Sequence, residues 1–117
     1  MRIEIRRKNN TAILISFDIE SEKFESNSER NKFFAKLHGR KQVIVKDSGR
    51  YEYRREGVLD EIPHIRVDNS VFIIAMEHMR RMMEFFKEWE DKVDVKTFPV
   101  LLKKKQLEEL EREVEIE

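Results

Sequence analysis

Short runs of β-branched and aromatic residues, most of them alternating with polar residues, predict six β-strands. The first two strands are separated by Asn9–Asn10 and the third and fourth by Asp47–Ser48–Gly49, so each pair is expected to form a hairpin. The fifth run is apolar throughout, which is typical of a central strand buried on both faces. Pro99 places the last strand at a sheet edge. The predicted strands are 2–7, 11–18, 42–46, 50–54, 71–75 and 93–102.

Apolar residues spaced three and four apart predict three helices, at 28–38, 76–90 and 103–117. Ser26 and Glu29 match a capping box before the first helix, and Gly39 supplies its end. Methionines and phenylalanines form a wide stripe on the second helix, which favours a place in the core. Residues 57–70 show no sustained period and predict a connecting loop, with one short helical turn at 59–62.

The order of these elements predicts an α+β fold with an antiparallel sheet and helices on one face. Without the first strand and the last helix, the order resembles the ferredoxin-like plait, β-α-β-β-α-β, in which two helices cover one face of the sheet. The resemblance rests on element order and implies a fold only. We therefore expect a single α+β domain at 1–102, consisting of a ferredoxin-like βαββαβ core elaborated by an N-terminal strand. An amphipathic C-terminal helix at 103–117 is expected to dock on the domain or on a second subunit.

Length and composition limit the class of protein. A chain of 117 residues is expected to form one core. The longest uncharged apolar stretch, 71–76, is far shorter than the roughly 20 residues that span a bilayer, and the N-terminus lacks the apolar segment of a signal peptide. We expect a cytoplasmic protein with no membrane partner. The absence of cysteine agrees with this, and the 41% charged residues with few glutamines suggest a thermophile.

The net charge of zero conceals a division along the chain. Residues 1–55 carry a balance of +6, and residues 56–117 a balance of −6. A locally basic surface attracts polyanions even when the whole molecule is neutral. The alternative is that the two halves attract each other, within one chain or across a homodimer. A homodimer would also explain the sparse apolar face of the last helix, formed by Leu107, Leu110 and Val114.

The hairpin at 42–54 carries the strongest functional signal. Strand periodicity places Tyr51, Tyr53 and Arg55 on one face and Arg50, Glu52 and Arg54 on the other. Exposed tyrosines stack on unpaired bases at about 1–3 kcal/mol each, while basic neighbours neutralise phosphates. We therefore expect a non-catalytic protein that binds single-stranded RNA or DNA; the alternative is that the tyrosines cover the sheet. The expected binding residues are Arg40, Lys41, Lys46, Arg50, Tyr51, Tyr53, Arg54 and Arg55.

Two other functions remain open. Asp94 and Lys96, two apart on a predicted strand, have the acid-x-lysine form of restriction-like nucleases, in which a carboxylate binds Mg²⁺. Such a site needs a second acid, with Asp68 as the candidate metal ligand and Asp60 or Glu61 as alternatives. The third possibility is a structural homo-oligomeric assembly protein. The three histidines lack metal-ligand spacing, so outside the nuclease hypothesis we expect no metal and no cofactor.

Overall fold

The computed structural model describes residues 11–116, with side chains described as far as Leu110. This part of the chain contains six strands, four α-helices and two 3₁₀ turns. The strands are β1 (Thr11–Ile19), β2 (Arg40–Lys46), β3 (Gly49–Arg55), β4 (His64–Asp68), β5 (Val71–Ile74) and β6 (Val93–Leu101). The helices are α2 (Asn27–His38), α3 (Val58–Glu61), α4 (Met79–Lys87) and α5 (Lys104–Ile116), and the 3₁₀ turns are Ser21–Lys23 and Met76–His78.

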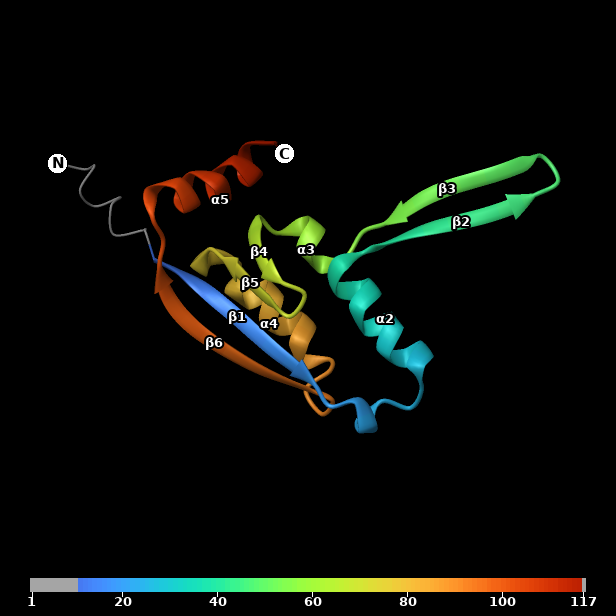
Figure 1. Cartoon of the computed structure of the whole chain (residues 1–117), viewed down its shortest axis with the longest axis horizontal. Helices are drawn as coiled ribbons and strands as arrows, with labels where there is room; N and C mark the ends of the chain where they lie inside the picture. The colour runs from blue at the N-terminus through green and yellow to red at the C-terminus, as the bar shows by residue number, and fades with distance from the viewer. Residues whose placement is uncertain (1–10, 117) are drawn as a thin grey trace.

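Four of the strands form one antiparallel sheet in the order β4-β5-β1-β6 (Figure 1). This confirms the predicted α+β class with an antiparallel sheet. β5 lies between β4 and β1, as expected for its apolar run, and β6 with Pro99 lies at an edge. β1 is paired on both sides, with β5 through residues 13–16 and with β6 along its whole length. The predicted first strand, 2–7, lies outside the described residues.

The main core lies between the sheet and helices α2 and α4. β1 contributes Ile13, Ile15 and Phe17, which alternate with residues on the opposite face of the sheet, as strand geometry requires. Phe33 of α2 is fully buried and its ring lies 5.1–6.4 Å, centre to centre, from six aromatic rings. These rings belong to Phe17, Phe24, Phe34, Phe85, Phe86 and Trp89. The core therefore converges on one phenylalanine of α2.

The opposite face of the sheet is covered in part by α5. Ala12 and Ile73 point away from the main core and form a second buried cluster with Leu102 and Leu110. The prediction that helices lie on one face is therefore wrong for α5, although it describes α2 and α4. Sparse leucines suffice for α5 because they meet apolar side chains of the sheet. The side chain of Val114 lies outside the described residues.

Two further segments differ from their predictions. Residues 57–70 contain the short helix α3 and the strand β4 in addition to loop. β4 has a bulge between Arg66 and Asp68 and lies at the sheet edge with mostly exposed side chains, so no clean alternation marks it in the sequence. The helix predicted at 76–90 is divided into a 3₁₀ turn and α4, which ends at Lys87.

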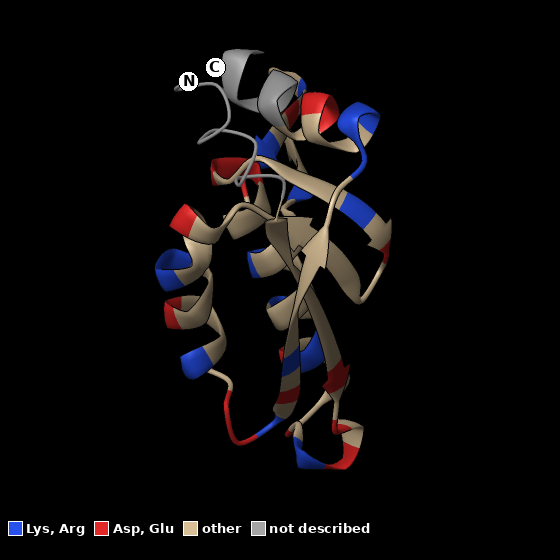
Figure 2. Ribbon diagram, turned by 90° about the vertical axis from the view of Figure 1, so that its left-hand side faces the viewer, with Lys and Arg blue, Asp and Glu red and all other residues tan. Residues whose placement is uncertain are grey.

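The hairpin β2–β3 forms as predicted but pairs with no other strand of residues 11–116. It is a separate two-stranded sheet that projects from the body beside α2 (Figure 1). None of its residues belongs to either buried cluster. We call residues 40–55 the arm. On the side of the body remote from the arm, α4 shows basic and acidic residues in alternation (Figure 2). Among the described residues no helix has the length and apolar character needed to cross a membrane.

Replacing Phe33 with alanine tests the central place of this ring. We expect Phe33→Ala to lower the free energy of unfolding by about 3–5 kcal/mol, because it leaves a cavity among packed rings. Denaturant unfolding at neutral pH measures the change. Phe98→Ala is the matched control, since Phe98 is 49% exposed on β6. Equal losses in the two variants would contradict the assignment of the core.

Candidate functional site

The arm leaves and rejoins the body at two glycines in contact. Gly39 ends α2 with a φ of 82°, a left-handed conformation that favours glycine. A Cβ atom on Gly57 would lie 2.3 Å from the Gly39 nitrogen and 2.6 Å from the Leu37 carbonyl oxygen. Only a residue without a side chain allows the two backbone segments to approach this closely. The glycines therefore define the root of the arm.

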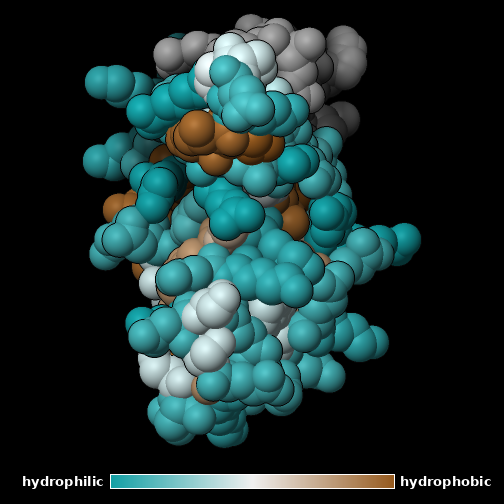
Figure 3. Space-filling model, turned by 90° about the vertical axis from the view of Figure 1, so that its right-hand side faces the viewer, coloured by the Kyte–Doolittle hydropathy of each residue, from teal (hydrophilic) through white to brown (hydrophobic). Residues whose placement is uncertain are grey.

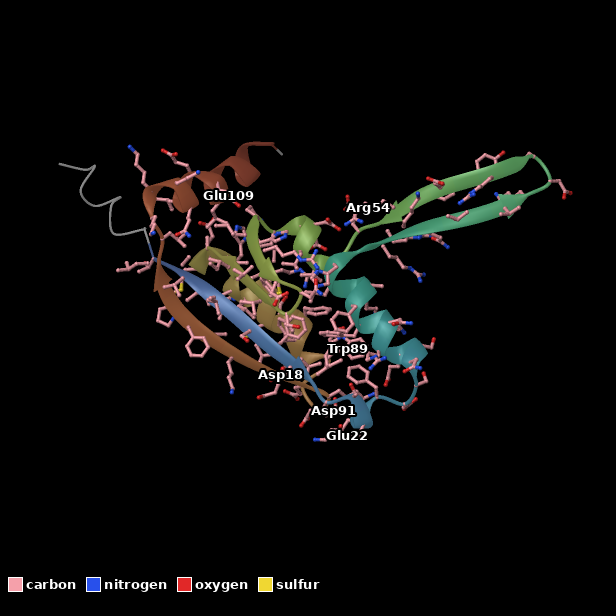
Figure 4. The ribbon with its side chains drawn as sticks, viewed as in Figure 1. Asp18, Glu22, Arg54, Trp89, Asp91 and Glu109 are labelled. Carbon is pink, nitrogen blue, oxygen red and sulfur yellow. The ribbon has the colours of Figure 1, made fainter. Side chains whose placement is uncertain are left out.

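An ion pair fastens the same root. Arg54 Nη2 donates to Asp60 Oδ1 and Oδ2 at 2.9 and 2.8 Å, and to the His38 carbonyl oxygen at 3.0 Å. Asp60 Oδ2 also accepts the Gly57 amide at 2.7 Å. Burial raises the pKa of Asp60, but the Gly57 amide and the Arg54 guanidinium outweigh it, so this pKa lies below its ordinary value. Figure 4 shows Arg54 where the arm meets the body.

The arm has two faces of different character, because directly paired residues of an antiparallel ladder share a face. We call one the tyrosine face; its residues are Arg40, Gln42, Ile44, Lys46, Tyr51, Tyr53 and Arg55. We call the other the valine face; its residues are Lys41, Val43, Val45, Arg50, Glu52 and Arg54. The predicted binding residues are therefore divided between two sides of the ribbon.

Among the described side chains, carboxylates form ion pairs with the valine face only. Glu52 pairs with Lys41 at 2.9 Å and with Arg50 at 3.7 Å, and Asp60 pairs with Arg54. The tyrosine face contains no acidic residue, and within the described part of the chain no ion pair engages its three basic residues. Arg55 instead donates from Nε to Gln42 Oε1, and the Lys46 ammonium lies 5.8 Å from the centre of the Tyr51 ring. The tyrosine face therefore keeps its positive charge.

Both tyrosines are open to solvent. Tyr51 is 37% and Tyr53 47% exposed, as is typical of β3, whose residues are all exposed. The Tyr51 hydroxyl lies 2.7 Å from Ser48 Oγ in the turn, a hydrogen bond that restrains the ring. Viewed from the side on which the arm projects, the surface is mostly hydrophilic, with several separate hydrophobic areas (Figure 3). The large apolar side chains that the arm exposes are Val43 and Val45, at 41% and 77%.

A concavity of about 940 Å³ lies between the root of the tyrosine face and the outer side of α2. Arg40, Gln42 and Arg55 line it from the arm. The residues that line it from α2 and its surroundings are Ser26, Ser28, Glu29, Asn31, Lys32, Ala35, Lys36, Glu56 and Trp89. Lys32 and Lys36 were not among the predicted site residues, although their four-residue spacing on a predicted helix placed both on one face.

The residues of the nuclease hypothesis do not come together. Asp94 and Lys96 lie exposed on β6, whereas Asp68 lies on β4, with β5 and β1 between them. Three strand spacings correspond to roughly 14 Å, too far for two ligands of one metal ion. The residue directly opposite Asp94 is Asp18, seen at the lower end of the sheet in Figure 4. Among the described residues no group of three or more His, Asp or Glu side chains is arranged to hold a metal ion.

The alternative acids of that hypothesis are already engaged. Asp60 belongs to the arm root, and Glu61 pairs with Arg81 at 3.3 Å. His38, on the first helix, stacks on Phe34, and burial lowers its pKa, with the nearby Arg66 acting in the same direction. Burial therefore favours the neutral form of His38, whose Nε2 lies 3.2 Å from the Asn69 carbonyl oxygen.

Comparison with family models, with curated proteins and with solved structures gave no match.

Asp60→Asn tests the fastening of the arm. The substitution keeps the shape of the side chain but removes the charge that Arg54 and the Gly57 amide recognise. We expect a loss of about 1 kcal/mol in the free energy of unfolding at pH 7. Because the pKa of Asp60 is lowered in the folded state, its contribution is complete above the ordinary value of 3.8 and is lost as pH falls through the folded-state pKa.

The difference between native protein and Asp60→Asn should therefore shrink in acid, as measured by denaturant unfolding at pH 7 and near pH 3. Glu61→Gln is the matched control, because Glu61 is the neighbouring acid and its ion pair with Arg81 is exposed. A constant difference across this pH range would contradict the role of the charge.

Proposed function

We propose that the protein binds single-stranded RNA or DNA through the tyrosine face of the arm, without catalysing a reaction on it. The single observation that carries the proposal is the composition of this face. Tyr51 and Tyr53 are exposed beside three basic residues that have no carboxylate partner in the described part of the chain. A surface of this kind offers rings to bases and charge to phosphates at the same place.

The chemistry of the two rings suits unpaired bases. Tyr51 and Tyr53 are two residues apart on one strand, so their rings lie along the ribbon and leave room for successive bases. Each stacked base is worth about 1–3 kcal/mol, and stacking tolerates any base because every base has a π-face. We therefore expect little sequence preference.

The charge of the arm supports the same proposal. Residues 40–55 contain six basic and two acidic residues, a balance of +4, in a chain that is neutral overall. Lys41, Arg50 and Arg54 are held by carboxylates of the protein, so they offer little to a phosphate. Arg40, Lys46 and Arg55 are therefore the residues that we expect to release counterions when a strand binds.

We also infer that the four-stranded sheet with α2 and α4 is a ferredoxin-like unit that carries the arm as an insertion. Once β2 and β3 are set aside, the order is β1, α2, the pair β4–β5, α4 and β6, which follows the pattern β-α-β-β-α-β. All neighbouring strands pair antiparallel. In this interpretation the arm occupies the connection between the first helix and the second strand of the plait.

The double substitution Tyr51→Ala and Tyr53→Ala tests the role of the rings. We expect it to weaken binding to an oligothymidylate at least about 30-fold, because two stacked bases at about 1 kcal/mol each are lost. The slope of log K against log salt should stay the same, since no cation is removed. Fluorescence anisotropy across a salt series measures both quantities.

The control is Val43→Ala with Val45→Ala, which removes exposed side chains from the valine face of the same arm. If the valine variant loses as much affinity as the tyrosine variant, the assignment of the face is wrong.

Single charges on the two faces should behave differently. We expect Arg55→Gln to reduce the salt slope by about 0.7, the value for one contact to a single-stranded phosphate. Lys41→Gln should leave the slope unchanged, because Lys41 is paired with Glu52 on the valine face. Titrations of both variants over the same salt series test this, and equal changes in slope would count against a site restricted to the tyrosine face.

Shortening the arm separates binding from folding. Replacing residues 42–53 with Asn-Gly joins the paired residues Lys41 and Arg54 by a two-residue turn and keeps the root. We expect a free energy of unfolding within about 1 kcal/mol of the native value, because exposed residues away from core features contribute little. Binding of oligothymidylate should be lost. Cooperative unfolding with retained affinity would refute the proposed function.

A further inference from the structure

The concavity beside the arm joins the tyrosine face without a break. Arg40, Gln42 and Arg55 belong to both, since they are the root of the tyrosine face and one wall of the concavity. The other wall is α2, which diverges from the arm so that the two enclose an open angle (Figure 1). A linear ligand on Tyr51 and Tyr53 that follows the arm toward the body therefore enters this concavity.

The charges of the concavity favour an anion. Lys32, Lys36, Arg40 and Arg55 line it, against two acids, Glu29 and Glu56. Glu29 is already neutralised, because Lys92 Nζ lies 2.7 Å from its Oε2. That contact, followed by the Glu25 amide, lowers the pKa of Glu29, and the same pair raises the pKa of Lys92. Within the described part of the chain, four cations thus line the concavity with one carboxylate, Glu56, that no ion pair engages.

The two lysines of α2 are free for a ligand. Lys32 and Lys36 are exposed, and among the described residues no ion pair engages either of them. Four helical residues separate them by about 6 Å along the axis of α2, whereas Tyr51 and Arg55 span about 13 Å along β3. A strand that touches both tyrosines and both lysines must therefore be longer than one that the arm alone could hold.

We propose that the single strand bound by the tyrosine face continues into the concavity, where Lys32 and Lys36 of α2 contact its phosphates. This proposal rests on the proposed function and extends it, because it assigns a second segment of the same ligand to a helix that the arm does not include. Ser28, Asn31 and Gln42 also line the concavity, and their polar groups offer hydrogen bonds to sugar or base.

Trp89 provides a local readout. It is the only tryptophan of the chain, it lines the concavity, and it is 8% exposed. Its Nε1 is buried and has no acceptor among the described residues. Figure 4 shows Trp89 beneath α2, away from the arm. Tryptophan fluorescence therefore reports on the concavity separately from events at Tyr51 and Tyr53.

The test compares Lys32→Gln, Lys36→Gln with the native protein on oligothymidylates of about twelve and about three nucleotides, lengths that do and do not exceed a short binding site. For the longer strand we expect the double variant to reduce the salt slope by roughly 1.4, from two lost phosphate contacts. For the shorter strand, which the arm holds alone, we expect no change. The longer strand should also change the Trp89 fluorescence of the native protein, and the shorter strand should not.

Lys104→Gln with Lys105→Gln is the matched control, because these exposed lysines lie on α5, across the sheet from the concavity. If the Lys32, Lys36 variant keeps the native slope on the longer strand while the tyrosine variant loses affinity, the extension along α2 is wrong and the arm alone is the site. If the native protein binds neither strand at low salt, both proposals are overturned. If the α5 control loses as much slope as the α2 variant, the lysines of α2 are not special and the extension is again refuted.

Discussion

The close contact of Gly39 and Gly57 is the constraint on which the proposed binding surface depends. A two-stranded hairpin is marginally stable by itself in water, and the arm contributes no residue to either buried cluster. Its direction is therefore determined where the two backbone segments cross. Neither glycine position has room for a side chain of its own. Beside them, Asp60 accepts hydrogen bonds from Arg54 and from the Gly57 amide. Because α2 ends at Gly39, which is part of this contact, the angle between α2 and the arm follows from the root.

The ion pairs of the arm affect the distribution of positive charge between its two faces more than they affect the free energy of unfolding. Exposed pairs such as Lys41–Glu52 typically contribute less than about 1 kcal/mol to folding. They nevertheless neutralise one face of the ribbon and leave the other positive. From the sequence alone, the six basic residues of the arm would predict positive charge on both of its faces. The distribution of two carboxylates, Glu52 within the arm and Asp60 outside it, produces the asymmetry.

Much of the local structure follows from the sequence. The Ser26 cap, the Gly39 stop and the turn before Gly49 predicted α2 and the hairpin, and period-two alternation predicted correctly which residues share a face with the tyrosines. β4 was missed because it is a bulged edge strand with mostly exposed side chains. The position of the hairpin outside the main sheet could not be predicted either, because a strand pattern shows that a segment pairs and does not show how many neighbours the pair has. Lys32 and Lys36 become candidate binding residues only because the arm lies beside α2, which the sequence does not show.

Exposed strand edges normally invite pairing with another chain, and proteins protect them with charged side chains. Both edges of the arm are free in the described part of the chain, and its net charge of +4 opposes pairing with the arm of a second copy. The same charge favours a polyanion. Since the root already holds the arm in place, a strand bound as proposed would have to order only a few side chains, and less of its interaction energy would be lost to ordering the protein. The arm carries a positive charge that opposes contact with a second arm, and its root fixes its position. These two properties suit the proposed nucleic-acid ligand better than self-assembly through the arms.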